Sequence, residues 1–240
     1  MTKKAINQNA KYVTELINSI NPDFLFNDKP LLRVKNNKLL NSIELQNKSR
    51  NLTKLANEIN AIENCKLKEN SNKLVFGNGN FNSPIMFIGG APDENDETLG
   101  KPFEGDVGAL FSKMLAAINL ERKDIYTCYT VNFRPPLDRK PSTSEIKRYA
   151  KFLVKHITII NPKIIVLMGS TAMEAITGLN NKISNERGKW KETIIKNTNL
   201  QTLITFDPSF LIRFPENKKY SWDDLKKIRN KIKDLKIKIK

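Results

Sequence analysis

Four short apolar runs, separated by segments with helical periodicity, constrain the fold of this chain more than any other feature. The runs cover residues 84–89, 125–131, 163–169 and 201–206, and the helical segments cover 107–118, 144–160, 171–177 and 221–235. Runs of this length that are rich in Ile, Val and Phe indicate buried strands. Strands that alternate with helices indicate a parallel sheet with helices on both faces. The sequence therefore predicts an α/β fold with three layers, α/β/α, around a four-stranded, mostly parallel sheet.

The first 54 residues follow a different pattern, because they are polar and prone to form helix. Four apolar residues share one helical face, at positions i, i+3, i+4 and i+7: Val13, Leu16, Ile17 and Ile20. Pro22 and Pro30 indicate a loop over 21–38, and a second helix is expected over 49–61. We therefore expect a helical and loop extension over residues 1–54, followed by one domain over residues 55–240.

The charge of the chain favours a polyanionic partner. The 240 residues include 41 Lys or Arg and 25 Asp or Glu, which gives a formal net charge of +16. Such a charge attracts nucleic acid through its phosphates. Lys, Asn and Ile are all abundant, as an AT-rich coding sequence would also produce, so a ribosomal or RNA partner and simple solubility stay open as alternatives.

No segment has the properties of a membrane span or of a secretory signal. Apolar stretches such as 164–168 are far shorter than the ~20 residues that a helix needs to cross a bilayer. The first residues, MTKKAINQNAKYV, contain no apolar core of a signal peptide. We therefore expect a cytoplasmic protein without a membrane partner.

In a parallel sheet, binding sites form beyond the carboxyl ends of the strands. The first run is followed by a sharp turn of three residues, Gly90, Ala91 and Pro92, and then by an acidic stretch over 93–97. Glycine and proline in such a turn let backbone N–H groups approach a ligand closely. Phe103 comes next, where its ring either stacks on a planar base or packs in the core.

The second and fourth runs also end in segments that suit a phosphate. The proline-rich loop 132–141 carries three basic residues, Arg134, Arg139 and Lys140, and the alternative for it is a solvated basic loop. After the fourth run, Asp207, Pro208 and Ser209 begin a helix. The free N–H groups of a helix start and the Ser209 hydroxyl suit a phosphate, although Asp207 opposes an anion. The alternative is an ordinary helix start.

The single histidine and the two cysteines make several common chemistries improbable. His156 falls in a helical stretch among apolar residues, which indicates a packing role and argues against a Ser-His-Asp or Cys-His arrangement. Cys65 and Cys128 are too few for a disulfide framework or a four-thiolate metal centre. We expect both thiols to be reduced and structural.

Taken in order, these segments match the motifs of one family. Residues 89–105 read GGAPDENDETLGKPFEG, and further matches are Arg-Pro-Pro at 134–136, Asn-Pro-Lys at 161–163, Arg-Gly-Lys-Trp at 187–190 and Asp-Pro-Ser at 207–209. Over roughly residues 55–232, the chain resembles the uracil-DNA glycosylase superfamily, most closely its family 4. The first motif of that family reads G-E-A-P-G-x-x-E-D-x-x-G-x-P-F-x-G.

The resemblance implies a compact α/β/α protein that flips a base out of DNA and cleaves its N-glycosidic bond with water. In the family, a Glu positions the water, an Asn reads the uracil edge and a His stabilises the departing base. Gly90, Tyr129 and Asp207 stand at these three positions, so the pocket is degenerate. Ala91, Pro92 and Phe103 remain as base-pocket residues beside Tyr129. The residues expected to contact DNA are Arg134, Arg139, Lys140, Pro208, Ser209 and Arg213.

The family also implies a four-iron four-sulfur cluster, which needs four cysteines. Only Cys65 matches a cluster position, while Phe133 and Tyr149 occupy two of the others and Cys128 lies elsewhere in the pattern. We therefore expect the cluster to be absent, with no other metal or cofactor bound.

Two functions stay open at this point. The first is a glycosylase that acts on a deaminated base, with Asp207 or the Asp96/Glu97 pair in place of the lost carboxylate. The second is a catalytically inactive homologue that holds DNA or RNA. In both cases we expect a monomer with DNA, double- or single-stranded, as the first candidate partner.

The C-terminal segment adds a further positive charge. Residues 218–240 carry ten Lys or Arg and three Asp. The spacing predicts a helix that docks through Leu225, Ile228, Ile232 and Leu235 and turns Lys226, Lys227, Lys233 and Lys236 to solvent. This face either adds phosphate contacts to a DNA groove or is a plain solvated surface.

Overall fold

In a computed structural model, the structure describes residues 33–238 of the chain. The chain divides into two units, Met1–Ile43 and Glu44–Lys240, and helix α2 (Arg33–Asn60) begins in the first and ends in the second. The helix expected around Val13 lies outside the described residues. The second helix expected over 49–61 is confirmed, but the loop expected over 21–38 is wrong for its last six residues. Those residues, RVKNNK, contain neither Pro nor Gly, so nothing in them interrupts α2.

The sheet has six strands in the order β1-β3-β2-β4-β6-β5. The four expected strands form its centre and run parallel: β2 (Ile85–Gly89), β3 (Tyr126–Tyr129), β4 (Ile164–Met168) and β6 (Thr198–Thr205). Two antiparallel edge strands, β1 (Gly77–Gly79) and β5 (Trp190–Ile195), correct the expected count of four. Sequence analysis missed them because β1 reads Gly-Asn-Gly and β5 carries polar residues, so neither is an apolar run.

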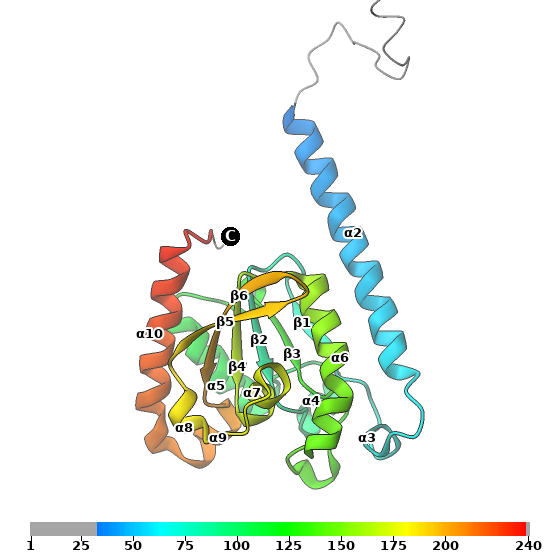
Figure 1. Cartoon of the computed structure of the whole chain (residues 1–240), viewed down its shortest axis with the longest axis vertical. Coiled ribbons are helices and arrows are strands. Elements are labelled where there is room, and N and C mark those ends of the chain that lie inside the picture. Colours follow the sequence, from blue (N-terminus) through cyan, green and yellow to red (C-terminus); the bar gives the residue numbers. More distant parts are fainter. Residues whose placement is uncertain (1–32, 239–240) are drawn as a thin grey trace, which may run out of the picture. The chain divides into compact units, whose positions relative to one another are not determined.

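Alternate residues of the central strands pack on opposite faces of the sheet. Ile85 and Phe87 of β2 join one core cluster with α5 (Gly105–Ala116) and α10 (Lys218–Asp234). Met86 and Ile88 join another cluster with α6 (Thr143–Ile160) and α7 (Ser170–Thr177). Helices therefore cover both faces of the sheet, as Figure 1 shows.

The four helices expected over 107–118, 144–160, 171–177 and 221–235 are confirmed within a few residues. Helix α6 begins at a capping box in which Ser142 and Glu145 bond to each other's backbone N–H groups. The helix start expected at Asp207, Pro208 and Ser209 is confirmed as α9 (Pro208–Arg213). The other short elements were not expected: α3 (Lys66–Glu69), α4 (Glu94–Leu99), α8 (Ile183–Glu186) and the 3-10 turns Arg122–Asp124, Pro136–Asp138 and Pro215–Asn217. No helix in residues 33–238 has the length and apolar character that a membrane span requires.

The C-terminal helix docks as expected, with two exceptions. Leu225, Ile228 and Ile232 are buried, whereas Leu235 is 37% exposed at the helix end. The expected solvated basic face is also reduced. Lys226 pairs with Asp223 at 2.8 Å, and the Lys227 Nζ donates to the Gly188 carbonyl at 2.7 Å. Two of the four lysines that were expected to face solvent therefore bond to other groups of the protein.

Candidate functional site

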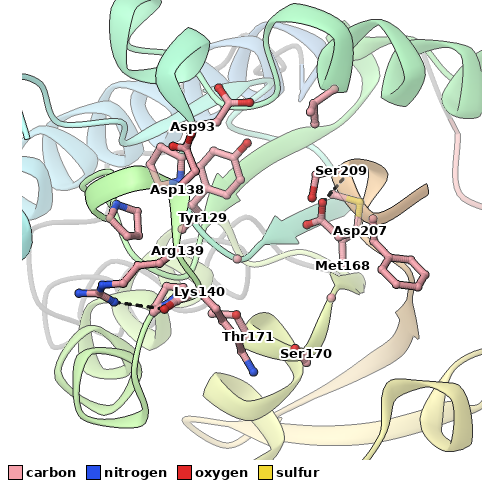
Figure 2. Close-up of a pocket in the computed structure, with 18 of the residues that line it drawn as sticks. Asp93, Tyr129, Asp138, Arg139, Lys140, Met168, Ser170, Thr171, Asp207 and Ser209 are labelled. Atoms are coloured by element: carbon pink, nitrogen blue, oxygen red, sulfur yellow. Dashed lines mark hydrogen bonds between the residues drawn. The ribbon is translucent and has the colours of Figure 1, made fainter. Parts of the chain in front are cut away.

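A cavity of about 530 Å³ lies beyond the carboxyl ends of β2, β3, β4 and β6. Its lining comes from the segments that follow these four strands, which lie far apart in the sequence (Figure 2). The cavity lies where the sequence analysis expected a site, at the strand ends. Because parallel strands present their carboxyl ends at one edge of the sheet, four separate segments meet there.

Three of the expected positions come together in this cavity. Gly90, Tyr129 and Asp207 all line it. Figure 2 shows Tyr129 and Asp207 on opposite sides of the cavity. Gly90 contributes no side chain. A Cβ atom added there would lie 3.2 Å from the Thr171 Cβ, so a larger residue at this position has to displace Thr171.

Tyr129 presents its ring to the cavity and keeps its hydroxyl buried. The side chain is 4% exposed. Its hydroxyl donates to the Asp96 Oδ2 at 2.7 Å and accepts from the Phe103 N–H at 3.1 Å. Burial and Asp96 hold the pKa of Tyr129 well above its usual value. The one hydroxyl proton of Tyr129 is therefore committed to Asp96 and is not free for a ligand.

The ring of Tyr129 also explains why the last residue of β2, Gly89, is a glycine. A Cβ atom added to Gly89 would lie 2.6 Å from Tyr129 Cε1 and 2.7 Å from Phe103 Cζ. Real Cβ atoms do not approach ring carbons this closely. The two rings therefore pack directly on the backbone of β2.

The carboxylate of Asp96 stabilises the turn that contains the acidic stretch 93–97. Its carboxylate accepts from the Asp93 N–H at 3.1 Å and from the Glu104 N–H at 2.8 Å, and it completes a capping box with Asp93 at the start of α4. Burial raises the pKa of Asp96 to about 6. Of the expected Asp96/Glu97 pair, only Asp96 lines the cavity. Glu97 instead accepts from the Asn72 N–H at 2.8 Å and lies 3.6 Å from Arg134.

Asp207 is the N-cap of α9. Its Oδ1 accepts from the Ser209 N–H at 2.8 Å, the contact drawn in Figure 2. Burial raises the pKa of Asp207. This cap explains why an acidic residue, Asp207, stands at a helix start that was expected to bind phosphate. The Ser209 N–H is already bonded to the Asp207 carboxylate, so only the Ser209 hydroxyl remains at the cavity.

Phe103 does not line the cavity, unlike Ala91, Pro92 and Tyr129. It is 2% exposed, and its ring packs against Phe111 and Tyr129 with centroid distances of 4.8 and 4.7 Å. Of the two placements that the sequence left open for Phe103, the structure has the core placement.

The expected DNA-contacting residues divide into two groups. Arg139, Lys140, Ser209 and Arg213 line the cavity, while Arg134 and Pro208 do not. Arg134 bonds Asp138 at 2.7 Å and also pairs with α4. Arg139 makes a two-point contact with Glu145 at 2.7 and 2.8 Å, which lowers the pKa of Glu145 to about 2. Within the described residues, Lys140 and Arg213 form no ion pair, although the charge of Arg213 lowers the pKa of the nearby Asp207.

The residues at the cluster positions do not fit an iron–sulfur centre. Cys65, Phe133 and Tyr149 do come together, but in a buried apolar cluster where the Cys65 Sγ lies 3.3 Å from the Tyr149 hydroxyl. One sulfur and two aromatic rings cannot replace four thiolates. Cys128 belongs to a different core cluster, and burial raises the pKa of its thiol. No other group of three or more metal-ligating side chains occurs in the part of the chain that the structure describes.

Sequence reasoning missed several lining residues. Ser170 and Thr171 follow the third strand, a segment that the strand-end rule selects but in which no residue had been named. Phe206, Phe210 and Ile183 also line the cavity. Ile183 lies on the short helix α8, for which the sequence carries no signal.

Comparisons with known proteins find the same family that the motifs indicated. A model of the uracil DNA glycosylase superfamily matches residues 76–229. The type-4 uracil-DNA glycosylase of Thermotoga maritima is 33% identical over 172 residues, which cover 70% of this chain and 88% of that protein. The protein of the same name from Sulfurisphaera tokodaii is 35% identical over 186 residues, covering 74% and 83%. That from Archaeoglobus fulgidus is 30% identical over 181 residues, covering 74% and 91%.

Proposed function

The chain belongs to the uracil DNA glycosylase superfamily, and from this premise we propose that it is a DNA-repair protein that takes one damaged base out of DNA and hydrolyses its N-glycosidic bond. Flipping the nucleotide exposes the bond to water, and the cost of unstacking is offset by contacts inside a pocket. The cavity at the strand ends is the pocket in this proposal.

The observation that carries the proposal is the meeting of Gly90, Tyr129 and Asp207 in one cavity. These are the positions at which the resemblance implies the water-positioning Glu, the base-reading Asn and the His. A volume of about 530 Å³ is within the range of pockets that hold a small molecule. In this proposal the position of the family's site is retained, although its three side chains are replaced.

The charged rim of the cavity supports DNA as the partner. Lys140 and Arg213 are free of ion pairs with described residues and line the same cavity, so both are available to phosphates on either side of a flipped nucleotide. The net charge of +16 adds a general attraction to DNA. Arg139 and Ser209 complete this group in the proposal.

Asp207 is the candidate catalytic residue. With glycine at position 90, it is the carboxylate that faces Tyr129 across the cavity. A raised pKa brings a carboxylate closer to neutral pH, where it accepts a proton from water more effectively. In the proposal, Asp207 takes the proton from the water that attacks C1′ of the sugar.

Incubation with oligonucleotides that contain one uracil, hypoxanthine or xanthine tests the proposal. Abasic sites are then broken with alkali, and Asp207→Asn is the matched variant, because Asn keeps the helix-cap acceptor and removes the charge. We expect cleavage above the level of a protein-free control, and less with the variant. Absence of cleavage, together with equal binding of damaged and undamaged duplexes, contradicts the proposal. Absence of cleavage with preferential binding of a damaged duplex indicates the inactive binding homologue.

We also propose that residues 55–240 carry this function as a monomer in the cytoplasm, with residues 1–54 as an extension. The match of the family model to residues 76–229 supports this division, because it lies entirely within the proposed domain.

A further inference from the structure

The cavity has an unusual charge for a protein this basic. Four aspartates line it, Asp93, Asp96, Asp138 and Asp207, against three basic residues, Arg139, Lys140 and Arg213. The formal balance of the lining is therefore −1, whereas the chain carries +16. Arg139 is also held by Glu145. The cavity is thus an acidic pocket in a basic protein.

Three of these aspartates, Asp93, Asp96 and Asp207, form no ion pair within the described residues. Burial raises the pKa of Asp207, the Ser209 N–H and the nearby charge of Arg213 lower it, and Asp93 raises it. A partly buried carboxylate that no cation contacts directly is costly, and a cationic ligand relieves that cost. Aromatic side chains lie beside them, because Tyr129, Phe206 and Phe210 also line the cavity. Aromatic faces attract cations as well.

The same lining is poorly suited to uracil. Uracil presents two carbonyl oxygens, which need hydrogen-bond donors. Among the described residues that line the cavity there is no Asn, Gln, His or Trp, and the Tyr129 hydroxyl donates to Asp96. The side-chain donors that remain are hydroxyl groups and basic groups: Ser170, Thr171, Ser209, Arg139, Lys140 and Arg213. A site without a side-chain amide, which can pair with a carbonyl and an N–H of the base edge together, discriminates against uracil. Asp207, at the position of the family's His, accepts hydrogen bonds and repels negative charge when ionised.

The charge on the departing base is a second argument against uracil as the substrate. A neutral base leaves as an anion, which a donor such as His stabilises. A base that is already cationic leaves as a neutral molecule and needs no such donor. The replacement of His by Asp therefore removes assistance that only a neutral base requires. An anionic carboxylate also stabilises the positive charge that develops on the sugar.

We propose that the base bound in this cavity carries a positive charge before its glycosidic bond breaks, as a purine alkylated on N3 or N7 does. This inference rests on the proposed function and specifies its substrate class. In the step, the oxygen of water bonds to C1′ of the sugar while the C1′–N9 bond breaks. The bonding electron pair passes to the purine, which leaves neutral, and the water's proton passes to Asp207.

Two assays on the full chain test the substrate class. The first compares the release of 7-methylguanine and 3-methyladenine from methylated duplex DNA with the release of uracil from a duplex of the same sequence. The second measures binding to a duplex with one 2′-fluoro-N7-methylguanosine, whose bond resists cleavage, against the unmethylated 2′-fluoro duplex. We expect release of methylated purines at least tenfold faster than uracil, and at least tenfold tighter binding of the methylated duplex.

Variants distinguish the effect of the Asp207 charge on base preference from an effect on the fold. Asp207→Asn keeps the acceptor for the Ser209 N–H, so we expect it to fold normally and to lose the preference for the methylated duplex. Asp106→Asn makes the same change at an exposed position of α5 that does not line the cavity, and it should keep the preference. Tyr129→Asn combined with Asp207→His restores two family residues and should shift the preference toward uracil.

The outcomes distinguish this inference from the proposed function. Faster release of uracil or hypoxanthine than of methylated purines overturns the inference and leaves the proposed function intact. No release of any base, with no preference between duplexes, overturns both. No release with tighter binding of the methylated duplex supports the substrate class and contradicts catalysis. A preference that survives Asp207→Asn overturns the role of the carboxylate.

Discussion

At the scale of single residues, burial decides the chemistry of the polar side chains. His156 is an example, because it lies in the core and not in the cavity. It is 2% exposed, stacks on Phe76 with a centroid distance of 4.4 Å, and places its Nε2 2.8 Å from the Tyr126 hydroxyl. Burial lowers the pKa of His156 to about 3. The expected packing role of this histidine is confirmed.

The buried His156 predicts how stability depends on pH. Between about pH 6.5 and pH 3 the unfolded chain binds a proton that the folded chain does not, so stability falls as the pH falls through this window. This residue contributes a slope of at most about 1.4 kcal/mol per pH unit. We expect His156→Gln, which cannot be protonated, to be less stable at pH 7.5 and to show a flatter dependence. Urea unfolding of both proteins from pH 4.5 to 7.5 measures this, and identical slopes contradict the prediction.

At the scale of elements, the start of α6 controls a cation of the site. Glu145 completes the capping box with Ser142 and also holds Arg139 by two hydrogen bonds. Arg139 lines the cavity, so the same carboxylate that caps the helix competes with a DNA phosphate for the guanidinium.

Glu145→Gln should release Arg139 while preserving the helix cap, since Gln also forms a capping box. We expect tighter DNA binding, with the slope of log K against log salt steeper by up to ~0.9, the value for one added phosphate contact. Ser142→Ala is the control, because it removes the cap hydroxyl and leaves the ion pair. It should lower the free energy of unfolding by about 1 kcal/mol without changing the slope. An unchanged slope for Glu145→Gln means that Arg139 does not reach DNA.

At the scale of the whole domain, the basic residues of α10 lie at different distances from the cavity. The helix begins beside α9 and runs to the opposite end of the sheet, about 25 Å away for its 17 residues (Figure 1). Its first residues, Lys218 and Lys219, adjoin the exposed aromatic side chains of Phe214, Tyr220 and Trp222. Basic side chains next to exposed aromatic side chains suit single-stranded nucleic acid.

The position of α10 changes which lysines we expect to bind DNA. Replacing Lys218 and Lys219 by Gln should make the salt slope shallower by up to ~1.8, for two lost phosphate contacts. Replacing Lys233 and Lys236 by Gln removes the same charge at the far end and should change the slope less. Equilibrium binding at several salt concentrations measures both. An equal effect of the two double variants means that DNA binding depends only on total charge.

Much of the fold was readable in the sequence, because its signals are local. Apolar runs indicated the four central strands, and helical periodicity indicated the helices between and after them. The edge strands β1 and β5 were not readable, since an edge strand is defined by its neighbour and needs no apolar run. The start of α2 was missed because Pro22 and Pro30 indicated a loop up to residue 38, whereas the helix is already formed at Arg33.

The candidate site, like the fold, was predictable from the sequence only in part. The motifs alone indicated that Gly90, Tyr129 and Asp207 belong to one pocket, because parallel strands bring their carboxyl ends together whatever the details of packing. Only the tertiary structure decided which side chains are free to act there. The Arg134 pairs with α4 join residues 37 and 40 positions apart, and the covering of Phe103 by Tyr129 joins residues 26 apart. Such contacts depend on three-dimensional distances of a few ångströms, which residue types and spacing do not specify.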